Sequence, residues 1–478
     1  MVNFWDYNVW GFVLILGVLL GSLLVANMLK KALPFLKKML IPNSVIGGVV
    51  ILVVTLIYKA ITGNVMFDTA LFGGNGTATL EVITYHSLAL GFIASAFKTT
   101  GSKLTKKRAG EIFDTGVTTV ATYLLQGVFG LAITIVAALV VTGFFSAAGV
   151  LLPFGYGQGT GQALNYGNIY ETDFGFVGGK SFGLTIAALG FLSAAIGGVI
   201  HLNIMKRSGR LVLSERKDGS LHTDELESYG EIPMQESVDK MTIQLALILV
   251  AYAIAYVIMS VLGNLLPGLR AVIFGFNFLL GVLSATLVKL TLNLLRKKHI
   301  IRRKYTNNFL MTRVSNFFFD IMVVAGVAAI RLDTLKDFWG IIIILGVVGA
   351  VITYVYNRVV AKTLFKDYYE EQFLAMYGML TGTASTGIIL LREVDGDFRT
   401  PASDNMVYQN FPAIVFGLPL MFLATLAPTK PILTLIIFIL FFAFLNVLLF
   451  RRQIFKRVKW GRDKEAEAEA VASAEEKE

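Results

Sequence analysis

The segment that decides the fold runs from Pro153 to Gly161 and reads Pro-Phe-Gly-Tyr-Gly-Gln-Gly-Thr-Gly. Its four glycines leave the backbone free to adopt unusual dihedral angles. Gln158 and Thr160, with Gln162 just beyond, add polar groups that lipid disfavours. The segment lies between two long apolar runs, so it interrupts the series of apolar segments that is typical of membrane-spanning helices. We therefore expect a helix break at this point that is enclosed by protein.

A second interruption of the same kind lies far downstream, where residues 377–387 read Tyr-Gly-Met-Leu-Thr-Gly-Thr-Ala-Ser-Thr-Gly. The run Gln-Gly-Thr-Gly at 158–161 aligns with Thr-Gly-Thr-Ala at 381–384 as a polar residue, a glycine, a threonine and a small residue. Paired polar breaks at corresponding places in two halves of a chain are typical of the binding site of a secondary transporter.

The composition indicates a polytopic membrane protein. Of the 478 residues, 55% are hydrophobic and 15% are charged, whereas soluble domains carry about 25% charged residues. The net charge of +10 comes from short Lys and Arg runs between apolar segments, which are typical topology signals and do not indicate a nucleic-acid partner. The chain has no cysteine and only four unclustered histidines, so we expect no disulfide and no zinc site.

Eleven apolar runs approach the roughly 20 residues that a membrane-spanning helix needs. The first run has no basic residue before it, so we expect it to remain as a span and not to act as a signal peptide. The predicted spans are residues 9–28, 44–61, 80–97, 115–141, 182–200, 241–262, 271–292, 309–330, 339–360, 411–426 and 432–450.

Basic clusters orient these spans, because Lys and Arg in short loops stay on the cytoplasmic side. The clusters lie at 30–38, 103–108, 206–217, 296–304, 358–366 and 451–457, and the intervening loops hold only scattered charges. This alternation holds only if each glycine-rich interruption enters and leaves on one side as a re-entrant hairpin. The two halves are then inverted, and the hairpin tips can meet near the middle of the membrane.

We therefore predict an all-α polytopic membrane protein of two inverted five-span repeats, each with a re-entrant hairpin, plus one extra C-terminal span. The predicted location is the cell inner (plasma) membrane, with the N-terminus outside and the C-terminus in the cytoplasm. The predicted units are residues 1–200 with a hairpin from outside around 150–170, a charged cytoplasmic linker at 201–240, residues 241–428 with a hairpin from inside around 370–392, the extra span at 429–450 and a cytoplasmic acidic tail at 451–478.

Several motifs resemble those of the bacterial sodium/glutamate symporter family: Phe-Leu-Lys-Lys at 35–38, Ile-Pro at 41–42 followed by Gly-Gly at 47–48, Gly-Gln-Gly-Thr-Gly at 157–161 and Gly-Thr-Ala-Ser-Thr at 382–386. The resemblance implies sodium-coupled uptake of glutamate, a dimer and an elevator-type motion. This chain departs from it in the long linker at 201–240, the eleventh span, the acidic tail and the sequence Leu-Arg-Glu-Val-Asp at 391–395. The substrate is therefore less firmly indicated than the fold.

We expect the two hairpins to bind the substrate. Broken helices aim their N-terminal dipoles at a carboxylate, while unwound carbonyl groups and hydroxyls coordinate sodium. The alternative is that the glycines only permit tight packing and the hydroxyls bond to their own helices. The candidate substrate-binding residues are Gln158, Gly159, Thr160, Gly161, Gln162, Thr381, Gly382, Thr383, Ser385, Thr386 and Arg392.

Three residues are candidates for ion binding. Asp320 places a carboxylate inside a predicted span. Ionised groups are costly within the membrane, so such a residue is by default expected to be functional. The alternative is that Asp320 pairs with Arg313 near the helix end. Gln126 carries an amide in an apolar segment, although a helix-to-helix hydrogen bond explains it equally well. Thr383 supplies a hydroxyl at the second break.

Two further side chains have competing interpretations. Arg392 can clamp a carboxylate with two hydrogen bonds, or it can form a local ion pair with Glu393, Asp395 or Asp397. His86 can relay protons, but a hydrogen-bonded packing histidine is the favoured interpretation.

The sequence as a whole predicts a symporter that carries glutamate or a similar small carboxylate inward with sodium as the coupling ion, and no cofactor or other metal is expected. One rival is the same scaffold coupled to protons or carrying another organic anion. A rival of another class is an ion channel, because re-entrant loops also build selectivity filters. An enzyme is not expected, since the spans offer no paired nucleophile and base.

Overall fold

The computed structural model describes residues 3–38, 40–98, 105–209, 231, 238–395 and 399–454. Lys103 and Asp397, most of the predicted linker and the predicted tail beyond residue 454 lie outside these ranges. The side chain of Ser385 is also outside the description.

Nine helices in these ranges are long and apolar enough to cross a membrane, and a bent pair of helices is a tenth candidate. This confirms the prediction of an all-α membrane protein. The tenth candidate joins α16 (Ala402–Tyr408) to α17 (Asn410–Leu426) at an angle of 49°. The nine are α1 (Tyr7–Ala32), α3 (Asn43–Thr62), α5 (Lys106–Val140), α7 (Gly179–Arg207), α9 (Lys240–Leu265), α11 (Asn277–Lys297), α12 (Asn308–Ala328), α13 (Trp339–Leu364) and α18 (Pro431–Leu449).

The predicted third span corresponds to α4 (Gly76–Ala96), which is not among these candidates. Its sequence carries Glu81, Thr84, His86 and Ser87, so it is less apolar than its neighbours. The ring of His86 bonds to the Tyr252 hydroxyl of α9 at 2.7 Å, as the packing interpretation expects. The remaining helices are shorter: α2 (Pro34–Lys38), α6 (Thr160–Phe174), α10 (Arg270–Gly275), α14 (Tyr369–Thr381) and α15 (Ala384–Arg392).

Two helices differ from their predicted limits for local reasons. Helix α5 begins nine residues before the predicted start at 115, because the Thr105 hydroxyl caps it by accepting from Arg108 N at 3.3 Å. The seventh predicted span is broken between α10 and α11. The carbonyl oxygen of Gly275 at this break accepts a hydrogen bond from the Asn165 amide at 2.8 Å, and that of Phe274 accepts one from the Tyr85 hydroxyl at 2.7 Å. Side chains from elsewhere in the chain therefore satisfy the backbone at the break.

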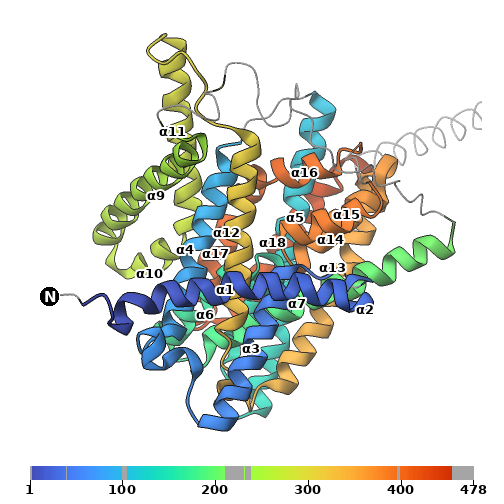
Figure 1. The fold of residues 1–478 in the computed structure, drawn as a ribbon. Helices are drawn as coiled ribbons and strands as arrows, with labels where there is room; N and C mark the ends of the chain where they lie inside the picture. The colour runs from blue at the N-terminus through green and yellow to red at the C-terminus, as the bar shows by residue number, and fades with distance from the viewer. Residues whose placement is uncertain are drawn as a thin grey trace, which may run out of the picture.

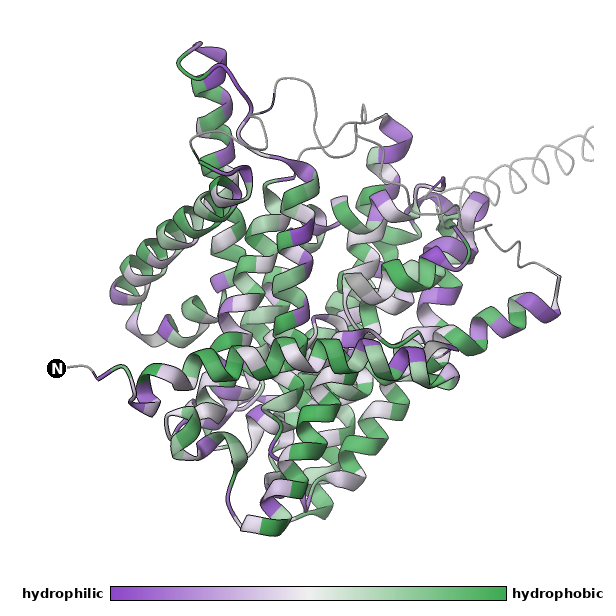
Figure 2. Cartoon of the chain, in the orientation of Figure 1, coloured by the Kyte–Doolittle hydropathy of each residue, from purple (hydrophilic) through white to green (hydrophobic). Residues whose placement is uncertain are grey.

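Figure 1 shows α9, α10 and α11 on one side of the molecule, α13, α14 and α15 on the other, and α4, α12 and α5 between them. The N-terminal end of α5 and the C-terminal end of α11, two ends with basic clusters, both lie at the top of this view. Figure 2 shows hydrophilic residues gathered there and hydrophobic residues along most of the helices below. The inverted repeat, the re-entrant hairpins and the membrane orientation remain predictions.

The centre of the molecule is closely packed. The largest buried apolar cluster draws on both halves of the chain and includes Leu88 of α4, Phe182 of α7 and Val324 of α12. Helices α4 and α12 approach so closely that a Cβ added at Gly91 would lie 2.7 Å from a ring carbon of Phe319. The Ser315 hydroxyl also donates to the Gly91 carbonyl oxygen at 2.9 Å. These two helices therefore form a rigid wall beside the glycine-rich breaks.

Candidate functional site

The first glycine-rich stretch is a helix break. A π-helical turn at Pro153–Gly157 ends just before Gln158, and α6 begins at Thr160. Between them Gly159 has φ +80° and ψ −171°, a conformation that is essentially restricted to glycine. The expected break is therefore present, and the first backbone N–H groups of α6 lack partners within their own helix.

The second stretch breaks in the same way. Helix α14 ends at Thr381, Gly382 adopts φ −138° and ψ −104°, and Thr383 is the extended N-cap of α15. The Thr383 and Thr386 hydroxyls lie 3.4 Å apart across the first turn of α15. A second helix N-terminus is thus positioned at the second break.

The two breaks meet in space although more than 200 residues separate them in the sequence. A Cβ added at Gly159 would lie 3.3 Å from the Thr383 methyl carbon and 3.5 Å from the Gly382 carbonyl oxygen. The absence of a side chain at Gly159 is therefore what lets the two tips touch.

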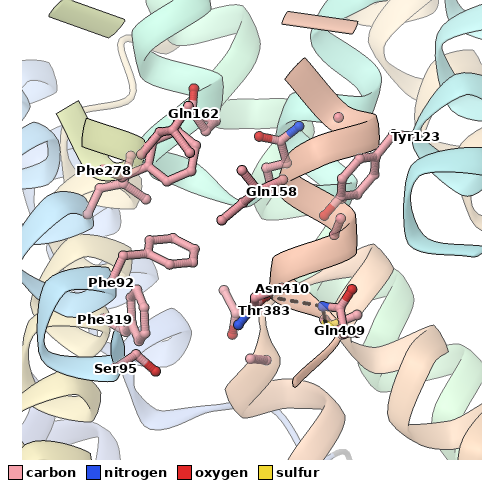
Figure 3. A pocket seen from close by; sticks show the side chains of 18 of the residues that line it. Phe92, Ser95, Tyr123, Gln158, Gln162, Phe278, Phe319, Thr383, Gln409 and Asn410 are labelled. Atoms are coloured by element: carbon pink, nitrogen blue, oxygen red, sulfur yellow. Dashed lines mark hydrogen bonds between the residues drawn. The ribbon is translucent and has the colours of Figure 1, made fainter. Parts of the chain in front are cut away.

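A cavity of about 160 Å³ lies beside the touching tips. Its lining residues come from α4, α5, α11, α12, α16 and α17 and from both breaks, and every one of them is uncharged. Figure 3 shows Phe92, Phe278 and Phe319 on one side and Gln158 and Thr383 on the other. The cavity thus has one aromatic wall and one polar wall.

The aromatic wall is a packed cluster on helices outside the hairpins. The Phe92 ring of α4 lies 5.2 Å from the Phe278 ring of α11 and 5.3 Å from the Phe319 ring of α12, measured between centroids. Such tilted and edge-to-face pairs hold one another in place. This wall suits the methylene groups of a small organic molecule.

Two of the amide side chains that line the cavity have atoms without a hydrogen-bond partner among the described residues. Gln162 Oε1 accepts from the Asn165 amide at 3.2 Å, which leaves the donor Nε2 unpaired. Gln409 Nε2 donates to Asn410 Oδ1 at 3.2 Å, which leaves the acceptor Oε1 unpaired. Both residues line the cavity, and unpaired buried polar atoms are costly, so a small rotation of either amide would offer a ligand one donor and one acceptor.

Gln126 lies where α5, α13 and the second hairpin meet. Its Nε2 donates to the Thr353 hydroxyl at 2.8 Å and to the Leu380 carbonyl oxygen at 2.9 Å. Its Oε1 is buried without a partner, and a Cβ added at Gly157 would lie 3.2 Å from it. The Asn357 side chain, which donates to the Thr353 carbonyl oxygen at 2.9 Å, also has an unpaired buried oxygen. Among the described residues, this seam therefore presents unpaired amide oxygen atoms, which are hard ligands, and no unpaired side-chain donor.

The other predicted hairpin residues are mostly packed away from the cavity. Thr160 is fully buried, and its hydroxyl lies 3.4 Å from the Met322 carbonyl oxygen of α12. A Cβ added at Gly161 would lie 2.8 Å from Leu88, so Gly161 permits close contact with α4. The Thr381 hydroxyl bonds to the carbonyl oxygen of Tyr377 in its own helix at 2.6 Å. Of the substrate-binding residues predicted from the sequence, Gln158, Gln162, Gly382 and Thr383 line the cavity.

Asp320 and Arg392 both lie outside the cavity lining. Asp320 is partly buried and its carboxyl group forms a side-chain hydrogen bond with Ser44 of α3. Arg313, its alternative partner, has its guanidinium 4.9 Å from the centre of the Phe309 ring. Arg392 is exposed at the last residue of α15, at the opposite end of that helix from Thr383.

A buried charged cluster anchors the start of α14. Glu370 accepts a hydrogen bond from the His201 ring at 2.8 Å and two from the Arg358 guanidinium, one of them at 2.8 Å. The second nitrogen of His201 bonds to the Tyr354 hydroxyl at 2.7 Å. Burial alone would raise the pKa of Glu370, but the hydrogen bonds and charges of His201 and Arg358 outweigh it and lower the pKa to about 2. This cluster ties α14, the helix before the second break, to α7 and α13.

Several cavity residues did not emerge from the sequence. Gln409 and Asn410 stand side by side just before the predicted tenth span, and this adjacent amide pair was an available signal. The phenylalanines of the aromatic wall offered none, because they belong to apolar runs that contain many similar residues.

Comparison with known proteins agrees with these features. The protein-family profile named sodium/glutamate symporter matches residues 12–399, which include both breaks and most of the cavity lining. No curated protein matches the chain as a relative. Because the profile covers most of the sequence, the chain belongs to the sodium/glutamate symporter family.

Proposed function

We propose that this protein imports glutamate or a similar small carboxylate together with sodium, and that the substrate binds in the 160 Å³ cavity beside the two hairpin tips. The observation that carries the proposal is the contact of the two breaks beside a cavity with an unpaired donor, Gln162 Nε2, and an unpaired acceptor, Gln409 Oε1.

An amino acid with an acidic side chain fits this arrangement without a cationic partner. Its carboxylates accept hydrogen bonds from Gln162 Nε2 and from the N-terminal backbone groups at the breaks, where helix dipoles favour negative charge. Its ammonium group donates to Gln409 Oε1, and its methylene groups pack on the aromatic wall. The lining carries no charged side chain, so carboxylate recognition falls to backbone and amide donors.

Sodium would bind among the oxygen atoms of the seam between α5 and α13. Gln126 Oε1 and Asn357 Oδ1 are buried and unpaired, and carbonyl-type oxygens are the ligands that broken helices offer to sodium in transporters. Gln126 also bonds to Leu380, which directly precedes the second break region, so an ion there would be coupled to the shape of that hairpin. Asp320 and Thr383 remain proposed as further ion ligands.

We further propose alternating access by an elevator motion, in which the hairpins move as a body along the wall formed by α4, α11 and α12. Gly161 faces Leu88 of α4, and Gly326 of α12 faces Thr160. The lack of side chains at these two glycines leaves a smooth surface between the hairpins and the wall, along which the hairpins could slide. The predicted homodimer and inward direction of transport belong to the same proposal. Cross-linking of cysteine pairs across the boundary in different states tests the motion, because the native chain has no cysteine.

The deciding experiment measures radiolabelled glutamate uptake into proteoliposomes with sodium, with potassium and with a proton gradient in place of sodium. The variant Gln162→Met plus Gln409→Met removes both unpaired amides with little change of size. Hydrogen bonds to charged groups contribute about 1.5–3 kcal/mol each, so uptake at low glutamate should fall at least about 100-fold.

The matched control is Asn168→Met, which makes the same kind of change at an exposed position of α6. It should transport like the wild type. Sodium-dependent glutamate uptake that survives in the double variant would refute the assigned cavity, and uptake driven equally well by protons would refute the sodium assignment.

A further inference from the structure

A second cavity of about 240 Å³ lies at the C-terminal end of α11, next to the segment that leads into α12. Among the described residues, its lining carries Lys289, Arg296, Arg303 and Lys304 and no acidic side chain. Of these four side chains, Lys304 forms an ion pair with Glu231 at 3.1 Å, and Glu231 also pairs with Lys240 at 3.0 Å. The cavity is therefore strongly cationic.

Both sides of this cavity are held in place by buried or partly buried hydrogen bonds. Lys289 Nζ donates to the Ala96 carbonyl oxygen at 3.3 Å and also to that of Lys98, which joins α11 to the end of α4. On the other side the fully buried Gln244 of α9 donates to the Tyr305 carbonyl oxygen at 2.8 Å and accepts from Asn307 N at 3.0 Å. The cationic groups thus surround a preformed hollow.

An apolar stripe runs along α11 to the level of this cavity. It consists of four leucines spaced by four, three and four residues, which places them on one face of the helix. Each is more than half exposed on a helix that qualifies as a membrane span. Figure 2 shows the change from a hydrophobic helix to a hydrophilic end at the top of α11. The members of this leucine stripe are Leu283, Leu287, Leu290 and Leu294.

We propose that this cavity binds the phosphate group of an anionic phospholipid, with an acyl chain lying along the leucine stripe. Guanidinium and ammonium groups are good phosphate partners, and basic pockets between helices at a membrane surface suit phosphorylated head groups. A soluble phosphate would use the cations but leave the leucines unused. The lipid would join α11 to the segment at residues 301–306 that leads into α12, whatever substrate the transporter carries.

The test compares two double variants that remove the same charge. Arg296→Gln plus Arg303→Gln changes the lining, whereas Lys297→Gln plus Arg302→Gln changes exposed neighbours outside it. Lys289 is kept because it supports α4. Each protein is placed in phosphatidylcholine nanodiscs that contain increasing phosphatidylglycerol, and retained phosphatidylglycerol is counted by native mass spectrometry.

We expect phosphatidylglycerol binding to weaken about 30-fold in the lining variant, equivalent to about 1 kcal/mol for each lost cation, and to stay near the wild-type value in the control. Equal binding by the two variants would overturn the proposal. Leu290→Gln plus Leu294→Gln, which keeps every cation, should also weaken binding, and no change in this variant would overturn the role of the stripe.

A final arm separates the two sources of phosphate. Wild-type protein in pure phosphatidylcholine receives inorganic phosphate in place of phosphatidylglycerol, and thermal unfolding is followed. Stabilisation by the lipid alone supports the proposal, whereas equal stabilisation by inorganic phosphate would overturn the assignment to a lipid.

Discussion

The sharpest prediction concerns Gly159, whose missing side chain allows the two hairpin tips to touch. In Gly159→Ala the residue must keep φ +80° and ψ −171°, which costs a non-glycine residue about 1–3 kcal/mol. The new Cβ would also lie 3.3 Å from the Thr383 methyl carbon, so one tip must shift by a few tenths of an ångström. Taking about 2–3 kcal/mol for the sum, the equilibrium between touching and separated tips moves by roughly 30- to 150-fold.

Two measurements check this prediction. Sodium-dependent glutamate uptake into proteoliposomes should fall by a similar factor, because the proposed site requires both tips. Spin labels on cysteines introduced at Asn168 and Arg392, both exposed, should report a broader distance between the two hairpins, and the native chain offers no competing cysteine.

The matched control is Gly175→Ala. Gly175 also has a positive φ, +71°, but a Cβ added there meets nothing within 4 Å. This variant should lose about 1–2 kcal/mol of folding stability from backbone strain and keep its transport activity. If Gly159→Ala transported as well as Gly175→Ala, the contact between the tips would not matter for function and the reasoning would fail.

Three further predictions follow from other contacts. Gln126→Leu should raise the sodium concentration for half-maximal uptake at least about tenfold, because it removes a proposed ion ligand worth at least about 1.4 kcal/mol; an unchanged sodium dependence would contradict this. Glu370→Gln should lower the free energy of unfolding by about 3 kcal/mol near neutral pH by leaving Arg358 without its carboxylate. Because the folded-state pKa of Glu370 is lowered from 4.5 to about 2, its stabilisation is present above about pH 4.5 and is lost as the pH falls towards 2, so the two chemical-denaturation curves should converge over that range. Gly326→Ala should slow transport strongly because its Cβ would lie 2.8 Å from Thr160 Cβ, whereas Gly340→Ala, which meets nothing, should not; equal rates would argue against a tight boundary there.

Much of the fold was predictable because local chemistry specifies it. Apolar runs of span length and basic clusters identify the membrane helices, and nine or ten of them are present. The polar residues of α4 also explain why this helix, the predicted third span, is not among the helices apolar enough to count as membrane-span candidates. The sequence did not predict the true start of α5, because that start depends on the Thr105 cap. It also did not predict the break at Phe276, because hydrogen bonds from side chains of α4 and α6 satisfy the backbone there.

The candidate site was only partly predictable. Gln158, Gln162, Gly382 and Thr383 were named from the sequence and line the cavity, whereas Thr160 is packed into α12 although its residue type seemed equally suitable. Whether a side chain on a short helix faces the cavity or a neighbouring helix depends on how that helix packs. The residue type alone does not determine this.

By itself the sequence determined the membrane class and the positions of the two breaks, since hydrophobicity, charge and glycine content act through neighbouring residues. Only the tertiary structure decided which groups meet there. Gln126 bonds to Leu380 across 254 positions, and the aromatic wall assembles from three separate helices. Such contacts depend on close packing of distant segments, and that packing places the two glycine-rich interruptions beside one cavity with an uncharged lining.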